Sequence, residues 1–232
     1  ELIKYAGNAF LALKISYINQ IADLCEKVGA DVHDVSRGIG LDKRIGSKFL
    51  HPGPGYGGSC FPKDTQALVK TANYYGSNIS LVENVISYNT QRKNYMAEKI
   101  ISALGKNYSN QKVSILGLAF KPETDDMRES PAIDIVNGLL KLKAKINVYD
   151  PAAIPEAKQK FSNKVLFSSS VQECIENRDI LVILTEWNEF RALDPKLILK
   201  LMRGNTIIDL RNIFDPNEML DENINYVSLG RN

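Results

Sequence analysis

The chain has few of the residues that form disulfides or bind metal ions. Of its 232 residues, three are cysteines and two are histidines. An odd number of cysteines, far apart and without a C-x-x-C pair, excludes a disulfide framework and indicates a reducing compartment, the cytoplasm. Neither His33 nor His51 lies near a cysteine at a ligand spacing. We therefore expect no metal site.

The chain also lacks a charge excess and a long apolar run. Its 29 basic and 27 acidic side chains leave a net charge of +2, too small to favour nucleic acid or an anionic membrane as a partner. No apolar run approaches the roughly 18–20 residues of a membrane span. The chain opens on Glu-Leu-Ile-Lys, inside a helical pattern and without an initiating Met. We therefore expect no signal peptide and a chain that is part of a longer protein.

Residues 1–110 have helical periodicity. One apolar face of a first helix recurs at three- and four-residue steps, at Phe10, Leu13, Tyr17, Ile21 and Leu24. A short helix over 32–37 is expected to end at Gly38 and Gly40. A loop over 51–59, rich in glycine and proline, precedes a helix expected from about Asp64 to Tyr75. Ser80-Leu-Val-Glu83 is a capping box, which predicts a connecting helix over 81–104, about 36 Å long.

Residues 111–232 alternate between strand and helix patterns. Strands are expected over 113–120, 146–149, 165–167, 180–184 and 206–210, and Ser130-Pro131 begins a helix to about Lys143. This alternation predicts an α/β fold: an all-helical domain followed by a Rossmann-like, doubly wound parallel sheet. Gly117-Leu-Ala-Phe-Lys121 departs from the G-x-G-x-x-G turn, so we expect no NAD bound there in the usual way.

The strongest chemical signal is Gly57-Gly-Ser-Cys60-Phe-Pro-Lys-Asp64. A cysteine before a helix start lies at the positive end of the helix dipole, and Lys63 is close in sequence. Both are expected to lower the pKa of the thiol and favour the nucleophilic thiolate. Asp64 is placed to accept a proton. The alternative is a buried structural cysteine, the commonest fate of a free thiol.

Other polar residues form weaker signals. Lys4 and Asn8 lie one helical turn apart on one face and suit the stabilisation of an oxyanion, or they are an ordinary exposed pair. Lys121 and Arg128 lie between a strand end and a helix start, a place that favours anions, or belong to a charged surface loop. Arg44 suits phosphate or carboxylate recognition, and is otherwise a surface arginine.

These segments together resemble the UDP-glucose/GDP-mannose dehydrogenase family. The Lys4/Asn8 helix, the Gly-Gly-Ser-Cys-Phe-Pro-Lys-Asp run and the Ala119-Phe-Lys-Pro-x-Thr-Asp-Asp-x-Arg128 run occur in the family's order and span most of the chain. The loop resembles the bacterial UDP-glucose branch most. GDP-mannose dehydrogenases are the nearest rival, and UDP-N-acetylmannosamine dehydrogenases tend to carry His in place of Ser59. A non-catalytic nucleotide-sugar-binding module is the alternative from another class.

The resemblance implies a role for each motif residue. Cys60 would capture the C6 aldehyde of UDP-glucose as a thiohemiacetal and then a thioester, giving UDP-glucuronate for polysaccharide biosynthesis. Lys4 and Asn8 would stabilise the oxyanion, and Asp64 would handle water or protons. Residues implied in substrate binding are Arg44, Phe49, Gly55, Tyr56, Gly57, Phe120, Lys121 and Arg211, and those implied near NAD are Lys63 and Arg128.

The resemblance also implies an assembly and a missing part. The first helix and the long helix would form a homodimer, in which Arg44 reaches the substrate of the neighbouring subunit. The family's N-terminal NAD-binding domain is absent from these residues. The two domains that we expect are a helical, dimerising domain over 1–110 and a UDP-sugar-binding domain over 111–232. We expect the chain alone to fold without oxidising a sugar.

Overall fold

The structure, a computed structural model, describes residues 1–105 and 111–231. Its contacts divide the chain into two compact units. Unit 1 comprises Glu1–Lys93 and the C-terminal residues from Leu229, and unit 2 comprises Asn94–Ser228. The long helix α4 (Ser80–Leu104) therefore contributes to both units. The composition changes near residue 110, whereas the contact boundary lies inside this helix.

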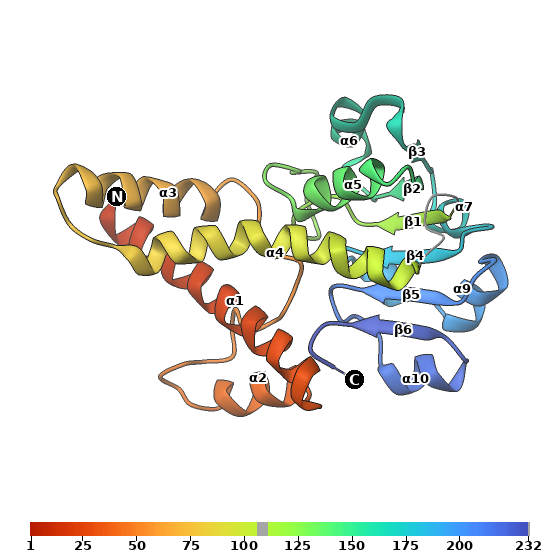
Figure 1. Cartoon of the computed structure of the whole chain (residues 1–232), viewed down its shortest axis with the longest axis horizontal. Helices are drawn as coiled ribbons and strands as arrows, with labels where there is room; N and C mark the ends of the chain where they lie inside the picture. The colour runs from red at the N-terminus through yellow and green to blue at the C-terminus, as the bar shows by residue number, and fades with distance from the viewer. Residues whose placement is uncertain (106–110, 232) are drawn as a thin grey trace. The chain divides into compact units, whose positions relative to one another are not determined.

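Unit 1 is helical. It contains α1 (Leu2–Val28), α2 (Val32–Gly40), α3 (Phe61–Tyr74) and the first part of α4 (Figure 1). Helix α1 ends at Gly29, whose left-handed φ of 72° turns the chain, and α2 begins after Asp31, whose carboxylate accepts from the amide of His33. The prediction that Gly38 and Gly40 stop α2 is wrong, because both glycines lie within the helix.

The core of unit 1 is built on the small residues of α1. Ala9, Ala12 and Ala22 are buried against α2, α3, α4 and the loop before α3. The stripe expected from the periodicity is different, since Phe10 is 61% and Leu24 52% exposed. Phe10, Tyr17 and Leu24 thus point away from the core of their own unit, whereas Ile18 and the alanines face it and the alanines allow close packing of helices.

Unit 2 contains a parallel sheet of six strands in the order β3-β2-β1-β4-β5-β6. In the central register, Val113 of β1 lies between Ile146 of β2 and Ile180 of β4. This order is that of the doubly wound nucleotide-binding sheets, with β1 and β4 on either side of the point where the strand order reverses. The strands are β1 (Lys112–Leu116), β2 (Lys145–Tyr149), β3 (Leu166–Phe167), β4 (Ile180–Ile183), β5 (Thr206–Asp209) and β6 (Asn225–Ser228).

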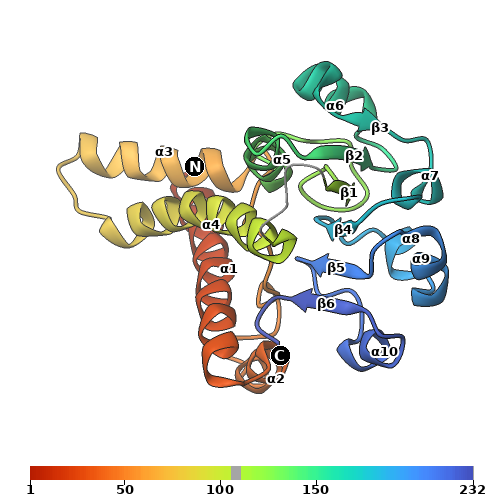
Figure 2. The same cartoon turned by 45° about the vertical axis from the view of Figure 1, so that its right-hand side comes forward.

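Helices cover both faces of this sheet (Figure 2). Helix α5 and the last part of α4 lie on one face, where Gly138 closely approaches Ala97. On the other face, α7, α8, α9 and α10 share one core with Leu181 and Ile207. The helices after α4 are α5 (Pro131–Lys141), α6 (Ile154–Phe161), α7 (Val171–Ile175), α8 (Asn188–Arg191), α9 (Pro195–Leu201) and α10 (Pro216–Asp221), with a 3-10 turn η2 (Ser162–Lys164).

Two predicted boundaries are corrected by the structure. Helix α3 begins at Phe61 rather than near Asp64, because Pro62 fits the first turn of a helix. Strand β1 ends at Leu116 rather than at residue 120, since Gly117 has a φ of 95° and turns the chain. At the start of α4, the side chain of Asn78 accepts from the amide of Ser80.

Candidate active site

The start of α3 presents the candidate nucleophile. Cys60 is the residue that precedes the helix, and its side chain is exposed. Its carbonyl accepts the first helical hydrogen bond, from the amide of Asp64 at 2.8 Å. The Ser59 hydroxyl lies 3.8 Å from the sulfur. The backbone therefore fixes the cysteine one helical turn before the aspartate.

Asp64 joins the predicted Lys4 and Asn8 into one cluster. The amide Nδ2 of Asn8 donates to Oδ2 of Asp64 at 2.6 Å, and Nζ of Lys4 lies 3.5 Å from the same oxygen. The carboxylate side chain is only 2% exposed, whereas Lys4 is 63% exposed. A buried carboxylate requires a compensating charge and donors, and α1 supplies both. The structure thus brings together three of the four residues predicted to be catalytic, and Cys60 lies one turn away along α3.

The glycine-rich loop before Cys60 is held by side chains that the sequence analysis did not identify. Asn89 of α4 accepts from the amide of Tyr56 at 2.8 Å and donates to its carbonyl at 3.0 Å. Asn19 of α1 accepts from the amide of Gly53, and Arg92 donates to the carbonyl of Gly53. Polar residues at buried helix positions are the signal that would have identified these anchors.

Aromatic rings connect this loop to α3. The ring of Phe61 lies 6.0 Å from those of both Phe49 and Tyr56, with the Tyr56 pair edge to face. Burial raises the pKa of Tyr56 to about 12, partly offset by its hydrogen bond with Thr65. The phenol therefore stays neutral. Of the residues implied in sugar binding, Phe49, Tyr56 and the loop glycines Gly55 and Gly57 all lie in this segment.

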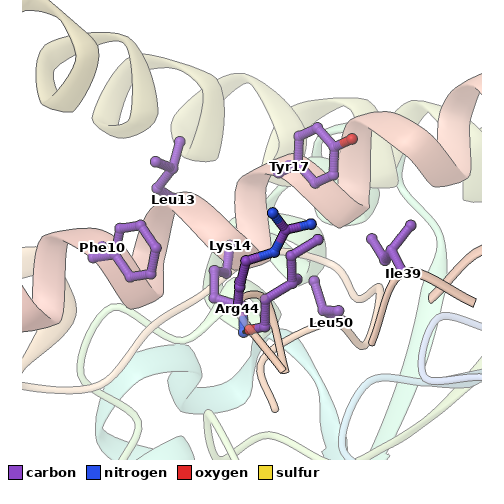
Figure 3. Close-up of a pocket in the computed structure, with 8 residues that line it drawn as sticks. Phe10, Leu13, Lys14, Tyr17, Ile39, Arg44 and Leu50 are labelled. Carbon is purple, nitrogen blue, oxygen red and sulfur yellow. The ribbon is translucent and has the colours of Figure 1, made fainter. Parts of the chain in front are cut away.

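An apolar hollow of about 320 Å³ lies on unit 1 around Arg44 (Figure 3). Figure 3 shows Phe10 and Tyr17 of α1 and Ile39 of α2 around the arginine. The guanidinium forms a two-pronged pair with the carboxylate of Asp42, which lowers the pKa of that carboxyl group. Arg44 itself is 89% exposed, so its charge faces outward.

In unit 2, the loops after β1, β4 and β5 meet at the reversal of strand order. Arg211 donates from Nε to the carbonyl of Leu184 and from Nη2 to that of Phe120, and it pairs with Glu186 at 3.2 Å. Nζ of Lys121 lies 5.5 Å from the Phe120 ring centre. The structure therefore places the three residues predicted for this edge together, where open α/β sheets bind ligands.

The turn after β1 does not fit a dinucleotide. The buried carboxylate of Asp150 accepts from the amides of Leu118 and Ala119 at 2.7 and 3.0 Å, and from the indole of Trp187. In dinucleotide-binding sheets, the backbone of this turn faces a pyrophosphate. Here the Asp150 carboxylate accepts from the backbone amides that would face the pyrophosphate, so the residues of unit 2 do not fit NAD at this turn.

The remaining candidates lie on exposed surfaces. Lys63 is exposed on the first turn of α3, and Arg128 forms an ion pair with Asp126 at 2.8 Å. Asp126 has a lowered pKa, chiefly because of this hydrogen bond to Arg128. Within residues 1–105 and 111–231, the structure contains no group of three potential metal ligands from His, Cys, Asp and Glu. Cys25 and Cys174 are buried, in contrast to Cys60.

The strand order of unit 2 and the cysteine-carboxylate arrangement of unit 1 define a class: a nucleotide-binding α/β protein with a candidate cysteine nucleophile. The chain belongs to the UDP-glucose/GDP-mannose dehydrogenase family. The family's central domain matches residues 1–91, and its UDP binding domain matches residues 114–216. This family is NAD-dependent.

Curated relatives match the whole chain. It is 53% identical to the UDP-glucose 6-dehydrogenase of Rhizobium meliloti, with all of this chain and 53% of that protein aligned. It is 46% identical to the UDP-glucose 6-dehydrogenase TuaD of Bacillus subtilis, with all of this chain and 50% of that protein aligned. The chain therefore spans about half the length of the curated relatives it matches.

Solved structures of related dehydrogenases have the same fold. A UDP-glucose dehydrogenase from Pyrobaculum islandicum superposes with a TM-score of 0.84 at 35% identity, over 94% of this chain and 48% of that one. A UDP-D-ManNAc dehydrogenase from Pyrococcus horikoshii gives 0.85 at 28% identity, over all of this chain and 51% of that one. None of the helices in the described part of the chain has the length and apolar character to cross a membrane.

Proposed function

We propose that this chain is the central and UDP-binding part of a cytoplasmic, NAD-dependent UDP-glucose 6-dehydrogenase, which oxidises UDP-glucose to UDP-glucuronate. The observation that carries the proposal is the cluster of Lys4, Asn8 and Asp64 one helical turn from the exposed Cys60. The 53% identity to a protein of that activity supports the choice of substrate. The turn after β1 does not fit NAD, so the proposed activity requires an NAD-binding segment in addition to units 1 and 2.

The proposed chemistry uses Cys60 to retain the intermediate. NAD, when bound, supplies the acceptor for the two hydrides removed from carbon six. After the alcohol has become an aldehyde, the thiolate of Cys60 adds to C6, and the aldehyde oxygen gains a proton to give a thiohemiacetal. Loss of a hydride and a proton then leaves a thioester. Water adds to its carbonyl, the C–S bond breaks, and the acid and the free thiol are released.

The cluster beside Cys60 would assist these steps. Lys4 and Asn8 would stabilise the negative charge that develops on the oxygen bound to carbon six, since one is a cation and the other an amide donor. In this structure the Asn8 amide donates to Asp64. The buried Asp64 would accept a proton from the attacking water. The identity and position of each side chain support its proposed role.

The binding residues divide between the two units. In unit 1, Phe49 and the backbone of Gly55, Tyr56 and Gly57 would contact the sugar, and Arg44 would contact the substrate of a neighbouring subunit. In unit 2, Phe120, Lys121 and Arg211 would bind the nucleotide at the loops after β1 and β5. Lys63 and Arg128 would lie near the NAD. Within each unit, the contacts of the glycine-rich loop and of Arg211 support the substrate-binding roles.

The choice among nucleotide sugars is testable by ligand stabilisation. UDP-glucose, UDP-N-acetylmannosamine and GDP-mannose are compared by thermal unfolding of the chain. A ligand at about 100 times its dissociation constant adds about 2.7 kcal/mol to the stability of the native state. We expect UDP-glucose to raise the melting temperature most and an Arg211→Ala variant to lose the increase.

Arg203→Ala is the matched control, since Arg203 pairs with Asp179 on the surface of the same unit. Its response to UDP-glucose should equal that of the wild type. Selective stabilisation by GDP-mannose or by UDP-N-acetylmannosamine would refute the choice of UDP-glucose.

We also propose a homodimer through the central helices. The exposed face of α1 carries Phe10, Tyr17 and Leu24, each about half exposed or more. With Leu13, Ile39 and Ile45, the first two line the apolar hollow around Arg44. A contiguous exposed apolar surface is typical of an interaction site. A second copy would cover this surface and place Arg44 at its substrate.

A further inference from the structure

We infer that Arg92 is a positioning residue for the candidate nucleophile: its buried guanidinium fixes Gly53 and, through the glycine-rich loop, the approach to Cys60. The inference rests on the proposed function and assigns a role to a residue outside the motifs. Its basis is a set of contacts within unit 1. Nε of Arg92 donates to the carbonyl of Gly53 at 2.7 Å, and Nη1 donates to both carboxylate oxygens of Asp23.

The burial of Arg92 is costly and requires an explanation. Its side chain is 0% exposed and forms its ion pair with the partly exposed Asp23. Nη2 of Arg92 has no hydrogen-bond partner among the residues that the structure describes. A buried ion pair often stabilises a protein no more than well-packed apolar residues of equal volume. Stability alone is therefore a weak reason for this arginine, and the contacts that it makes are the stronger one.

The contacts of Arg92 hold a segment without regular secondary structure. Residues 51–60 contain no helix or strand, so their backbone groups require partners from elsewhere. Asn19, Asn89 and Arg92 supply these partners at Gly53 and Tyr56. At Gly55 the backbone has a φ of 126°, and a Cβ there would lie 3.0 Å from the Asn89 amide oxygen. The loop is thus fitted closely to these side chains.

A chain of contacts connects the anchored loop to Cys60. Tyr56, whose backbone is bound by Asn89, packs its ring edge to face on Phe61, the residue after the cysteine. Tyr88 extends the anchor, since its hydroxyl donates to Asp23 and accepts from Arg92. Burial raises the pKa of Tyr88 to about 12, so it remains a neutral donor at physiological pH. Displacing Gly53 would therefore displace the loop that leads to the sulfur.

The test uses the C6 aldehyde of UDP-glucose as the probe on the whole chain. The Cys60 thiolate adds to the aldehyde carbon, the carbonyl oxygen takes up a proton, and no oxidant is needed. This reversible addition protects Cys60 from iodoacetamide, and mass spectrometry of the labelled peptide measures the protection. Buried Cys25 and Cys174 serve as internal references. The affinity for UDP, measured by calorimetry, reports on nucleotide binding independently.

Three variants are compared with the wild type. Arg92→Lys keeps the charge beside Asp23 but loses the fixed fork of donors. The double variant Arg92→Met, Asp23→Asn removes both charges, so neither is left buried and unpaired. Arg37→Lys is the matched control, because Arg37 is exposed and pairs with Asp34 on α2. Thermal unfolding identifies the variants that are folded.

We expect the Arg92 variants to lose protection of Cys60 by the aldehyde while they keep their affinity for UDP. In folded Arg92 variants, the aldehyde concentration for half-protection should rise about tenfold to a hundredfold, because small misplacements of a reacting group have effects of this size. UDP affinity and the iodoacetamide rate without the aldehyde should stay within about twofold. If the aldehyde protects Cys60 equally well in the wild type and in both Arg92 variants, the positioning role of Arg92 is refuted and the proposed function stands. Absence of protection in the wild type would overturn the proposed function and this inference together.

Discussion

At the scale of single residues, side chains that lie far apart in the sequence support the candidate site of unit 1. Cys60, Asp64, Lys4 and Asn8 are the residues proposed to act in catalysis, and the structure places the last three in contact. Asp23, Asn19 and Arg92 were not found, since a helical pattern does not show which polar residues face inward. Their partners lie in a loop many residues away, and only the folded chain brings these groups together.

The three cysteines should differ strongly in reactivity. Cys60 is exposed, whereas burial raises the pKa of the Cys174 thiol to about 12 and also raises that of Cys25. A raised pKa lowers the thiolate fraction at a given pH, and the thiolate is the reactive form. In the native chain at pH 7–8, we expect iodoacetamide to label Cys60 alone, and all three thiols in urea.

A Cys60→Ser chain is the control for this measurement. It should take up almost no label while it remains folded. If Cys25 or Cys174 were labelled as fast as Cys60 in the native wild type, that cysteine would not be buried in the folded chain.

At the scale of helices and strands, the strongest sequence patterns predict the correct elements, but some of the predicted ends differ from the observed ones by a few residues. Strands β1, β4 and β5 are predicted from runs of apolar residues, and the long helix α4 from the absence of breakers. Strand β6 and most of the short helices of unit 2 were missed. Two of those helices carry the same signal that identified α5, an N-cap before proline, at Asp194-Pro195 and Asp215-Pro216.

The turn after β1 provides a test at this scale. Gly117 has a φ of 95°, and a Cβ at this position would lie 2.5 Å from the side chain of Thr185. Gly117→Ala should therefore destabilise the protein by about 2–4 kcal/mol, through strain and displacement of the loop after β4. Urea unfolding followed by circular dichroism measures this change.

Gly7→Ala is the opposite case. Gly7 lies within α1 with nothing within 4 Å of an added Cβ, so alanine should stabilise the helix by about 0.5–1 kcal/mol. If Gly117→Ala were as stable as the wild type, the close approach of β1 and β4 at this turn would be refuted.

At the scale of the whole molecule, the apolar periodicity of α1 is compatible with packing inside its own unit or with packing against a second subunit. The stripe with Phe10, Tyr17 and Leu24 was read as one apolar face, and the structure shows that these three side chains are exposed in the single chain. A pattern in the sequence identifies an apolar face without telling whether its own unit or a second subunit covers it. Ile18 and the alanines of the same helix face the internal core.

The proposed homodimer is tested by charging this face. Phe10→Asp together with Tyr17→Asp should convert a dimer into a monomer, because buried unpaired carboxylates oppose association. Light scattering after gel filtration measures the mass in solution. Leu166→Asp, at an exposed apolar residue of β3 in unit 2, should leave the dimer intact. A monomeric wild type at micromolar concentration would contradict the proposed assembly.

The thioester mechanism is tested by the product that a Cys60→Ala variant makes in a protein that joins this chain to an NAD-binding domain. The wild type should form two molecules of NADH for each UDP-glucose and release UDP-glucuronate. Without the sulfur no thioester can form, so we predict that release of the acid falls by at least about a thousandfold while UDP binding is unchanged. Acid formation by Cys60→Ala at the wild-type rate would refute the thioester intermediate on Cys60.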